Sequence, residues 1–81
     1  MAHYFFDWRD NGSIDVDEEG VSLPDLASAQ AEAYRSLLER AREIPPGNER
    51  RSLSIDIRDE ASHHLLTVSV LVEVVIAQSI A

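Results

Sequence analysis

Apolar and polar side chains alternate near both ends of this sequence, and the alternation predicts strands. Residues 3–9 place aromatic side chains on one side of an extended chain and mostly polar ones on the other, as in a strand with one buried face. The aromatic side holds Tyr4, Phe6 and Trp8. Asn11-Gly12 follows, a strong hairpin signal because both residues tolerate positive φ. Residues 13–17 alternate again, so we expect a hairpin whose short second strand ends by Gly20.

The apolar spacing becomes helical after Pro24. Asp25 can accept a hydrogen bond from the free amides of a first helical turn, and its charge suits the positive end of the helix. Pro45-Pro46-Gly47 should end that helix, because proline cannot donate the amide that a continuing helix needs. The apolar stripe between these signals consists of Leu26, Ala29, Ala33, Leu37, Ala41 and Ile44, with Tyr34 and Leu38 beside it.

Two further strands are predicted after the helix. Residues 53–58 alternate, residues 59–62 have the composition of a turn, and residues 66–75 form a long last strand with a valine-rich face. Past Glu73 the apolar residues occupy both faces, so we expect this end to be covered on both sides or to belong to an interface.

The predicted fold is a single α+β domain spanning residues 1–81, with element order ββαββ. It consists of a four-stranded, mainly antiparallel sheet with one helix packed on one face. One helix cannot cover the far face, which explains why the outward residues are mostly polar. The apolar exceptions are candidates for an interface with a second copy or a protein partner, on the open face of the sheet or at the edge of the last strand: Phe5, Leu71, Val75 and Ile76.

Composition narrows the function classes. The 81 residues include no cysteine, so neither a disulfide nor a thiolate-bound metal can support so small a core, and oligomerisation is the usual remaining remedy. The net charge is −8 and all seven basic residues are arginine, which argues against nucleic acid and anionic membranes as partners. No signal peptide or membrane-spanning run is recognisable, so we expect a soluble, cytoplasmic protein.

The acidic run of residues 15–20 resembles the start of a calcium loop, with carboxylates at alternate positions and glycine at the sixth. The bidentate glutamate that completes such a loop is replaced by Leu26. We therefore expect a solvated acidic turn, and keep Asp15, Asp17 and Glu19 as a weak alternative cation site. No other metal or cofactor is predicted.

The remaining polar residues give no recognisable catalytic arrangement. The histidines lack the spacing of a chelating pair, so we interpret them as surface residues: His3, His63 and His64. Asp7, on the polar side of the first strand, is expected to pair with Arg9 or with Ser69. The aromatic first strand lacks the basic surround of a base-stacking platform, so packing under the helix is the preferred interpretation.

The chain resembles a family of small bacterial proteins classed only as a domain of unknown function. The resemblance covers nearly the whole chain and includes the valine-rich last strand. Its motifs are Tyr4-Phe5-Phe6-Asp7-Trp8-Arg9-Asp10, Asp17-Glu18-Glu19-Gly20, Leu23-Pro24-Asp25-Leu26 with Ala29 and Ala33, and Ile55-Asp56-Ile57-Arg58-Asp59-Glu60. Because that family has no assigned activity, the resemblance implies no functional residue.

A second similarity is to antitoxins of the HicB type, which also combine a small sheet, a helix and a Pro-Asp-Leu motif. In those antitoxins the motif continues Pro-Gly-Cys on a turn at a strand edge, whereas here Pro24-Asp25-Leu26 runs into Ala27-Ser28 and starts a helix.

The sequence thus favours a non-enzymatic acidic domain that acts through homodimerisation or protein–protein interaction. An antitoxin-like protein that masks a basic toxin is the alternative, and a weak cation-dependent hydrolase using the acidic run is the third hypothesis.

Overall fold

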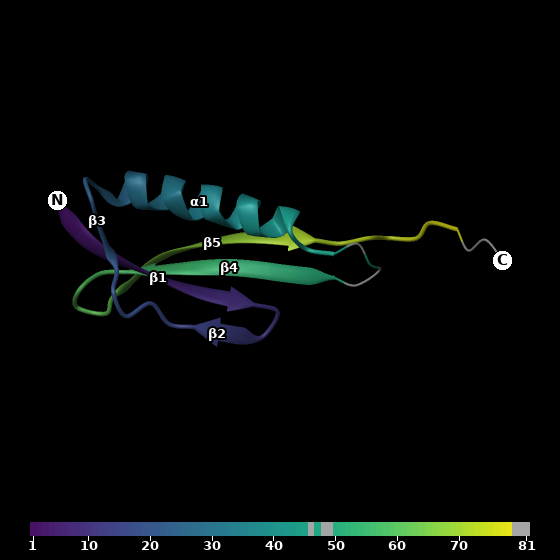
Figure 1. The fold of residues 1–81 in the computed structure, drawn as a ribbon, viewed down its shortest axis with the longest axis horizontal. Helices are drawn as coiled ribbons and strands as arrows, with labels where there is room; N and C mark the ends of the chain where they lie inside the picture. The colour runs from purple at the N-terminus through teal and green to yellow at the C-terminus, as the bar shows by residue number, and fades with distance from the viewer. Residues whose placement is uncertain (46, 48–49, 79–81) are drawn as a thin grey trace.

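The computed structural model describes residues 1–45, 47 and 50–78. Among these residues the chain folds as one helix and a five-stranded antiparallel sheet (Figure 1). The elements are β1 (Ala2–Asp10), β2 (Ser13–Asp15), β3 (Val21–Leu23), α1 (Leu26–Arg42), β4 (Arg51–Arg58) and β5 (His64–Val72). The α+β class and the single helix on one face agree with the sequence prediction.

The sheet has the order β2-β1-β4-β5, and β3 pairs with β1 beside β2. The prediction of four strands was wrong by one, because the segment after the first hairpin turn contacts β1 twice instead of once. β2 pairs with the end of β1 and β3 pairs with its beginning. Between them, residues 16–20 leave the ladder and form a loop. A single interrupted edge strand therefore replaces the short second strand.

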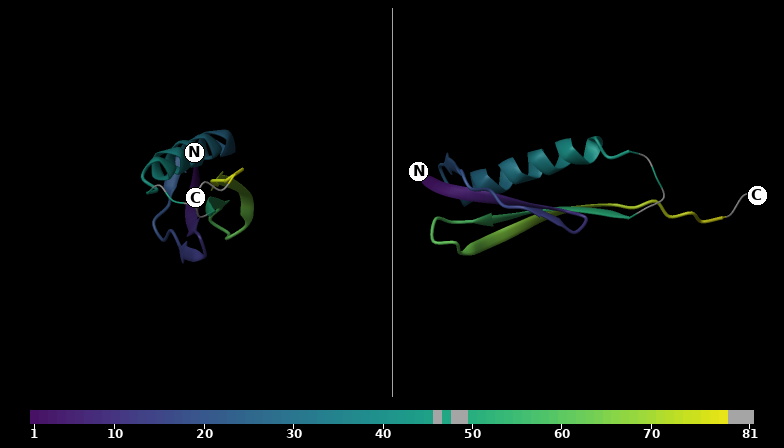
Figure 2. Two further views of the ribbon diagram at one scale, coloured as in Figure 1. Left: turned by 90° about the vertical axis from the view of Figure 1, so that its right-hand side faces the viewer. Right: turned by 60° about the horizontal axis from the view of Figure 1, so that its bottom comes forward.

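Helix α1 covers one face of the sheet, lying over β4 and β5, and leaves the other face, here called the open face, uncovered (Figure 2). The predicted alternation is confirmed, since the aromatic side of β1 packs toward the helix. Ala29 and Ala33 are completely buried, which lets the helix backbone approach the sheet closely. The fully buried large side chains between the helix and the sheet are Leu37 of α1 and Leu53, Ile55 and Ile57 of β4.

Local signals place the turns and the helix start as predicted. Asn11 and Gly12 both have positive φ, 49° and 102°, which matches the twist of a two-residue hairpin turn. The Ser28 N–H donates to Oδ1 of Asp25 at 2.8 Å, so Asp25 is the N-cap of α1. In the turn before β5, the Ser62 N–H donates to the Asp59 carbonyl at 3.0 Å.

Two boundaries differ from the predicted ones. Helix α1 ends at Arg42, before Ile44, and of the predicted stop signal Pro46 lies outside the described residues. The last strand ends at Val72 instead of residue 75, because its partner β4 begins at Arg51, opposite Val72. Residues 73–78 continue past the sheet beyond the end of the helix (Figure 1).

Candidate functional site

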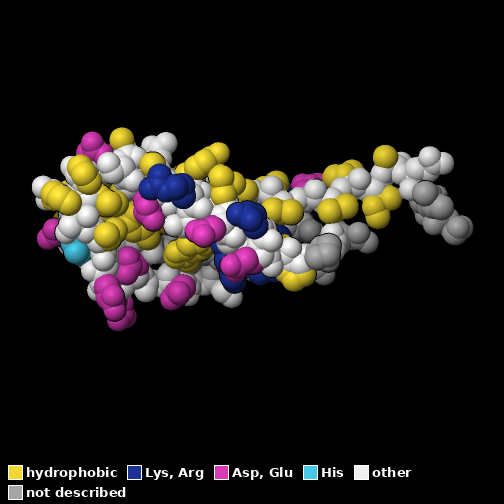
Figure 3. Space-filling model, turned by 45° about the horizontal axis from the view of Figure 1, so that its top comes forward, with side chains coloured by type: hydrophobic (Ala, Val, Ile, Leu, Met, Phe, Trp, Pro, Cys, Tyr) yellow, Lys and Arg dark blue, Asp and Glu magenta, His cyan; other side chains and the backbone are white. Residues whose placement is uncertain are grey.

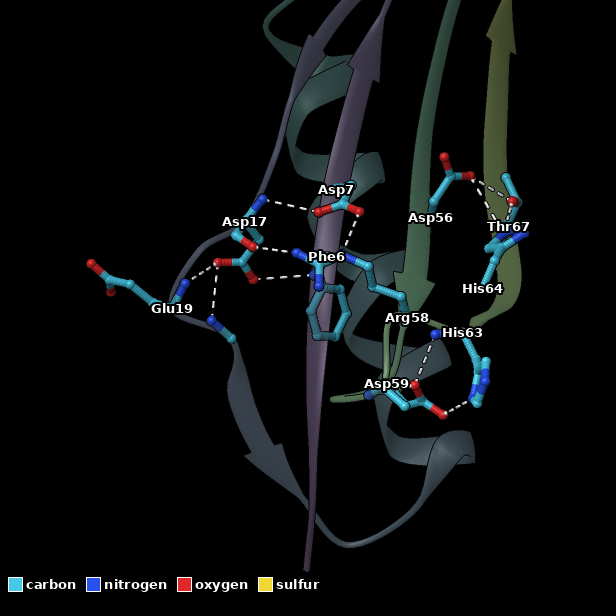
Figure 4. Close-up of polar contacts among 12 residues, drawn as sticks. Phe6, Asp7, Asp17, Glu19, Asp56, Arg58, Asp59, His63, His64 and Thr67 are labelled. Atoms are coloured by element: carbon cyan, nitrogen blue, oxygen red, sulfur yellow. Dashed lines mark hydrogen bonds and ion pairs between the residues drawn. The ribbon is translucent and has the colours of Figure 1, made fainter.

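The acidic loop between β2 and β3 is held by one side chain, Asp17. Its Oδ1 accepts the N–H groups of Glu19 and Gly20, both at 3.0 Å, and its Oδ2 accepts the N–H of Phe6 at 3.1 Å. Phe6 lies in the stretch of β1 that neither β2 nor β3 pairs with. The carboxylate therefore takes the place of the missing strand in satisfying that amide (Figure 4).

Arg58 joins this loop to the open face of the sheet. Its Nε donates to Asp7 Oδ2 at 2.9 Å and its Nη2 donates to the Asp17 carbonyl at 2.6 Å. The other oxygen of Asp7 accepts the Asp17 N–H at 3.0 Å. Asp7, Asp17 and Arg58 thus form one network, which we call the Asp17 network. Asp7 forms a cross-strand ion pair, but its partner is neither Arg9 nor Ser69, because a diagonal neighbour on β4 supplies the arginine.

The environment of Asp17 keeps it ionised. Partial burial works to raise the pKa of Asp17, but the N–H donors of Gly20, Phe6 and Glu19 and the positive charge of Arg58 together hold it below the usual 3.8. A carboxylate that already accepts three backbone hydrogen bonds has little free capacity to coordinate a cation. Its function here is to fix the loop.

The other carboxylates proposed from the sequence lie around a shallow hollow beside the loop. The hollow has a volume of about 550 Å³, with Phe6 and Trp8 among its apolar lining. Its acidic lining consists of Asp15, Asp17, Glu18 and Glu19. Within the described residues, no cluster of three or more histidine or acidic side chains has the geometry to hold a metal ion. The acidic run supplies negative charge to this surface rather than an assembled ligand set.

A second polar cluster joins β4 to β5 on the open face. The Thr67 hydroxyl donates to Asp56 Oδ1 at 2.6 Å, and the same oxygen accepts Nη2 of Arg9 at 3.0 Å. Partial burial works to raise the pKa of Asp56, but the hydrogen bonds from Thr67 and Arg9 hold it below 3.8. His64 Nε2 lies 2.7 Å from Thr67 Oγ1.

This cluster resembles a hydroxyl–histidine–carboxylate arrangement only in composition. Because the Thr67 proton points to Asp56, His64 must donate to the threonine oxygen and cannot accept its proton in this geometry. In this geometry the cluster joins β4 to β5.

The other two histidines also bind backbone or turn groups, in line with the surface interpretation. His3 Nε2–H donates to the Glu19 carbonyl at 2.9 Å, which places His3 against the acidic loop. His63 Nδ1 lies 3.2 Å from Asp59 Oδ2 in the turn before β5.

The candidate interface residues do not lie together. Phe5 is half-buried beneath Arg58 and edge-on to His3, level with the start of β5. Leu71 lies at the other end of β5, with 48 % of its surface exposed. Val75 and Ile76 are 76 % and 63 % exposed and belong to the segment past the sheet, where hydrophobic side chains gather (Figure 3).

β5 forms an edge of the sheet, and backbone hydrogen bonds determine which of its amides point outward. Within the described residues it pairs with β4 alone. The Asn11 N–H donates to the Ser52 carbonyl, so Ser52 faces β1 and its neighbour Leu53 faces β5, where it pairs with Val70. Alternation then directs the N–H and C=O groups of every second residue of β5 away from β4. These residues are Thr67, Ser69 and Leu71.

A shallow apolar groove runs along this edge between α1 and β5. It has a volume of about 300 Å³ and is lined by Ala27, Gln30, Ala31, Tyr34, Arg35 and Val68. Tyr34 and Leu38, one helical turn apart on this flank, are 57 % and 42 % exposed. Sequence periodicity predicted that Tyr34 and Leu38 lie beside the apolar stripe of the helix. The arrangement of α1 over β5 shows in addition that they lie beside the free edge of β5.

The sequence pattern of the family described as a domain of unknown function (DUF6894) matches residues 3–71. The chain belongs to this family. The DUF6894 match spans all of α1, nearly all of β1 and most of β5, and therefore includes the Asp17 network. No curated protein and no solved structure matches the chain significantly.

Within the described part of this DUF6894 chain, no helix has the length and apolar character needed to cross a bilayer.

The sequence indicated the free edge of β5 only in part. Leu71 and the apolar residues after Val72 were visible as a pattern. The partner of Asp7 was not, because it depends on the register of Asp7 opposite Asp56, which places Arg58 diagonally across from it.

Proposed function

We propose that this protein is a non-enzymatic interaction domain that forms a homodimer through the free edge of β5. The observation that carries the proposal is the nine-residue edge strand β5, whose outward amides lie beside an apolar groove. The chain continues from this strand into a segment of exposed apolar residues. Such an edge is a template for pairing with another strand.

The contrast with the other edge of the sheet supports this choice. There, the strand is short and interrupted, and Asp17 satisfies the amide of Phe6 that is left between β2 and β3. Short, irregular and charged edges are the usual protection against pairing. β5 has none of these protections along residues 66–72, and its helix-side residues are all leucine or valine.

A homodimer is the simplest partner for this edge. Two antiparallel copies of β5 related by a two-fold axis present the same surface to each other, so each copy satisfies the other's outward amides. The small buried core makes added burial valuable for stability. We place this assembly in the cytoplasm, where a chain without cysteine needs no disulfide.

Sedimentation at high micromolar concentration tests the proposal. We expect the wild type to be a dimer. Ser69→Pro removes an outward N–H at a position where an edge strand tolerates proline, and Leu71→Asp adds a charge to the edge, so both should be folded monomers. Ile14→Asp is the matched control, because Ile14 is 68 % exposed on the same face at the opposite edge.

A monomeric wild type at high micromolar concentration would contradict the proposal. So would a dimer that persists in both Ser69→Pro and Leu71→Asp, because the interface would then lie elsewhere.

The acidic hollow favours a second candidate, the masking of a basic protein. Its rim combines carboxylates with the Phe6 and Trp8 rings, a surface that suits arginine side chains. Titration with an arginine-rich peptide at low and high salt tests this candidate. We expect salt-sensitive binding that is lost in Asp15→Asn/Glu18→Gln/Glu19→Gln, and equal binding by that triple variant would contradict it.

A further inference from the structure

We infer that residues 73–78 of each copy pair with β5 of the other copy, so that the partner's Val74 lies in the groove between α1 and β5. The inference rests on the homodimer proposed above and specifies its register. It is carried by the alternation of the C-terminal segment, by the orientation of the edge amides and by the position of the groove.

Symmetry restricts the pairing first. Two edge strands that join antiparallel into one continuous sheet are related by a two-fold axis perpendicular to that sheet, so both helices lie on the same side. Residues directly opposite each other must also point to the same face. A helix-side residue such as Val68 can therefore be opposite only another helix-side residue of the partner.

The residues after Val72 continue the pattern of β5 without a break. The helix-side positions of β5 are Leu66, Val68, Val70 and Val72, and the same alternation puts Val74 and Ile76 on that side. Val74 and Ile76 are 49 % and 63 % exposed. The segment that carries them extends past both the helix and β4 within one copy (Figure 1). Antiparallel pairing would bring it beneath the helix of the other copy.

The open face selects one register among those that symmetry permits. When Leu71 lies opposite the partner's Leu71, two half-exposed apolar side chains cover each other. A slide of two residues in either direction puts Leu71 opposite Ser69 or Glu73 instead. In the self-opposed register, residues 73–78 run alongside residues 64–69 of the partner.

In this register the partner's Val74 lies opposite Val68. Val68 is the β5 residue that lines the groove, next to Ala31 and Tyr34 of α1. The partner's Ile76 lies one position further along, opposite Leu66. The groove is thus covered by the only strongly apolar segment that projects from the described fold, and the exposed flank of Tyr34 gains a neighbour.

Disulfide trapping tests the register, because the chain has no cysteine of its own. Helix-side residues of the paired edges are non-hydrogen-bonded partners with Cα atoms about 4.5 Å apart, within the range that a disulfide spans. We expect Val68→Cys/Val74→Cys to give a covalent dimer under mild oxidation. The two positions cannot bond within one copy, because six extended residues span about 20 Å.

Two further double-cysteine variants are controls, because their cysteines would lie opposite each other only if the register were shifted by two residues. Val68→Cys/Val72→Cys and Val68→Cys/Ile76→Cys should give several-fold less covalent dimer, as should the single variants. Leu66→Cys/Ile76→Cys is a second pair in the expected register, and it keeps the test informative if Val68→Cys disturbs the core. Circular dichroism verifies that each variant is folded.

Sedimentation of the reduced proteins distinguishes failure of the proposed register from failure of the homodimer itself. Covalent trapping in the expected pairs supports the register. A wild-type dimer that traps instead in a neighbouring pair, or in none of them, overturns the register and leaves the homodimer standing. A monomeric wild type overturns both.

Discussion

The guanidinium carbon of Arg58 lies 4.5 Å from the centre of the Phe5 ring, directly opposite it in the register of β1 and β4. The same guanidinium pairs with Asp7 and reaches the carbonyl of Asp17. One side chain therefore covers an aromatic ring on the open face, neutralises a carboxylate and anchors the loop that interrupts the edge strand. Phe5, a candidate interface residue, is thus partly covered by Arg58 within the same chain.

Replacement of Arg58 should destabilise the fold more than loss of a surface arginine. Asp7 and Arg58 retain only 17 % and 22 % side-chain exposure, so Arg58→Met leaves Asp7 partly buried without its charge partner. We expect a loss of about 2 kcal/mol in the free energy of unfolding. Arg35→Met, which removes an exposed pair with Glu32, is the control and should change little. Equal effects in urea titrations would contradict the role given to Arg58.

Gly20 should be the least replaceable glycine. Its φ is +70°, and an added Cβ would lie 2.8 Å from the Tyr4 carbonyl oxygen and 2.6 Å from the His3 ring. Gly12 also has positive φ, but nothing lies within 4 Å of its added Cβ. We expect Gly12→Ala to cost about 1 kcal/mol and Gly20→Ala clearly more, because steric overlap adds to the backbone term. Thermal unfolding of the pair checks this, and equal melting temperatures would count against it.

Acid should weaken the loop through Asp17. Its pKa is lower in the folded protein than the usual 3.8, so the stability it contributes is fully present above that pH and is lost as the pH falls through the folded value. The difference in unfolding free energy between wild type and Asp17→Asn should therefore be constant at neutral pH and shrink below about pH 4. Urea titrations across this range measure it, and a difference that grows on acidification would refute the assignment.

Calcium should not stabilise the protein through the acidic loop. Asp17 already binds three backbone amides, so coordination would have to displace them. We expect millimolar Ca²⁺ to shift the melting temperature no more than magnesium or sodium chloride at equal ionic strength. A saturable, calcium-specific increase that disappears in Asp15→Asn/Glu19→Gln would contradict this and revive the hydrolase hypothesis.

Local signals in the sequence were sufficient for most of the elements. The hairpin turn, the Asp25 cap, the buried alanine stripe and the alternation of β4 each depend on residues close together in the chain. The division of the second strand was not predictable in this way. It depends on Asp17 binding the Phe6 amide, a contact across 11 residues.

The candidate surface was less predictable than the fold. The apolar residues near the C-terminus indicated an interface on the open face or at the edge of the last strand, but the strand order that leaves β5 at an edge was not predictable. Nor could it show that Tyr34 and Val68 line one groove. Both facts depend on the connection from β3 through α1 to β4. This connection places β4 between β1 and β5, and it places α1 over β4 and β5.

Amide hydrogen exchange along β5 tests the central claim most directly. The N–H groups of Thr67, Ser69 and Leu71 point away from β4, whereas those of Val68 and Val70 bond to it. We expect the first three to exchange slowly, at rates near those of Val68 and Val70, at concentrations where the protein is dimeric, and to exchange fast on dilution. If they exchange fast at high micromolar concentration while Val68 and Val70 stay protected, the edge of β5 is free in solution and the proposed dimer does not form there.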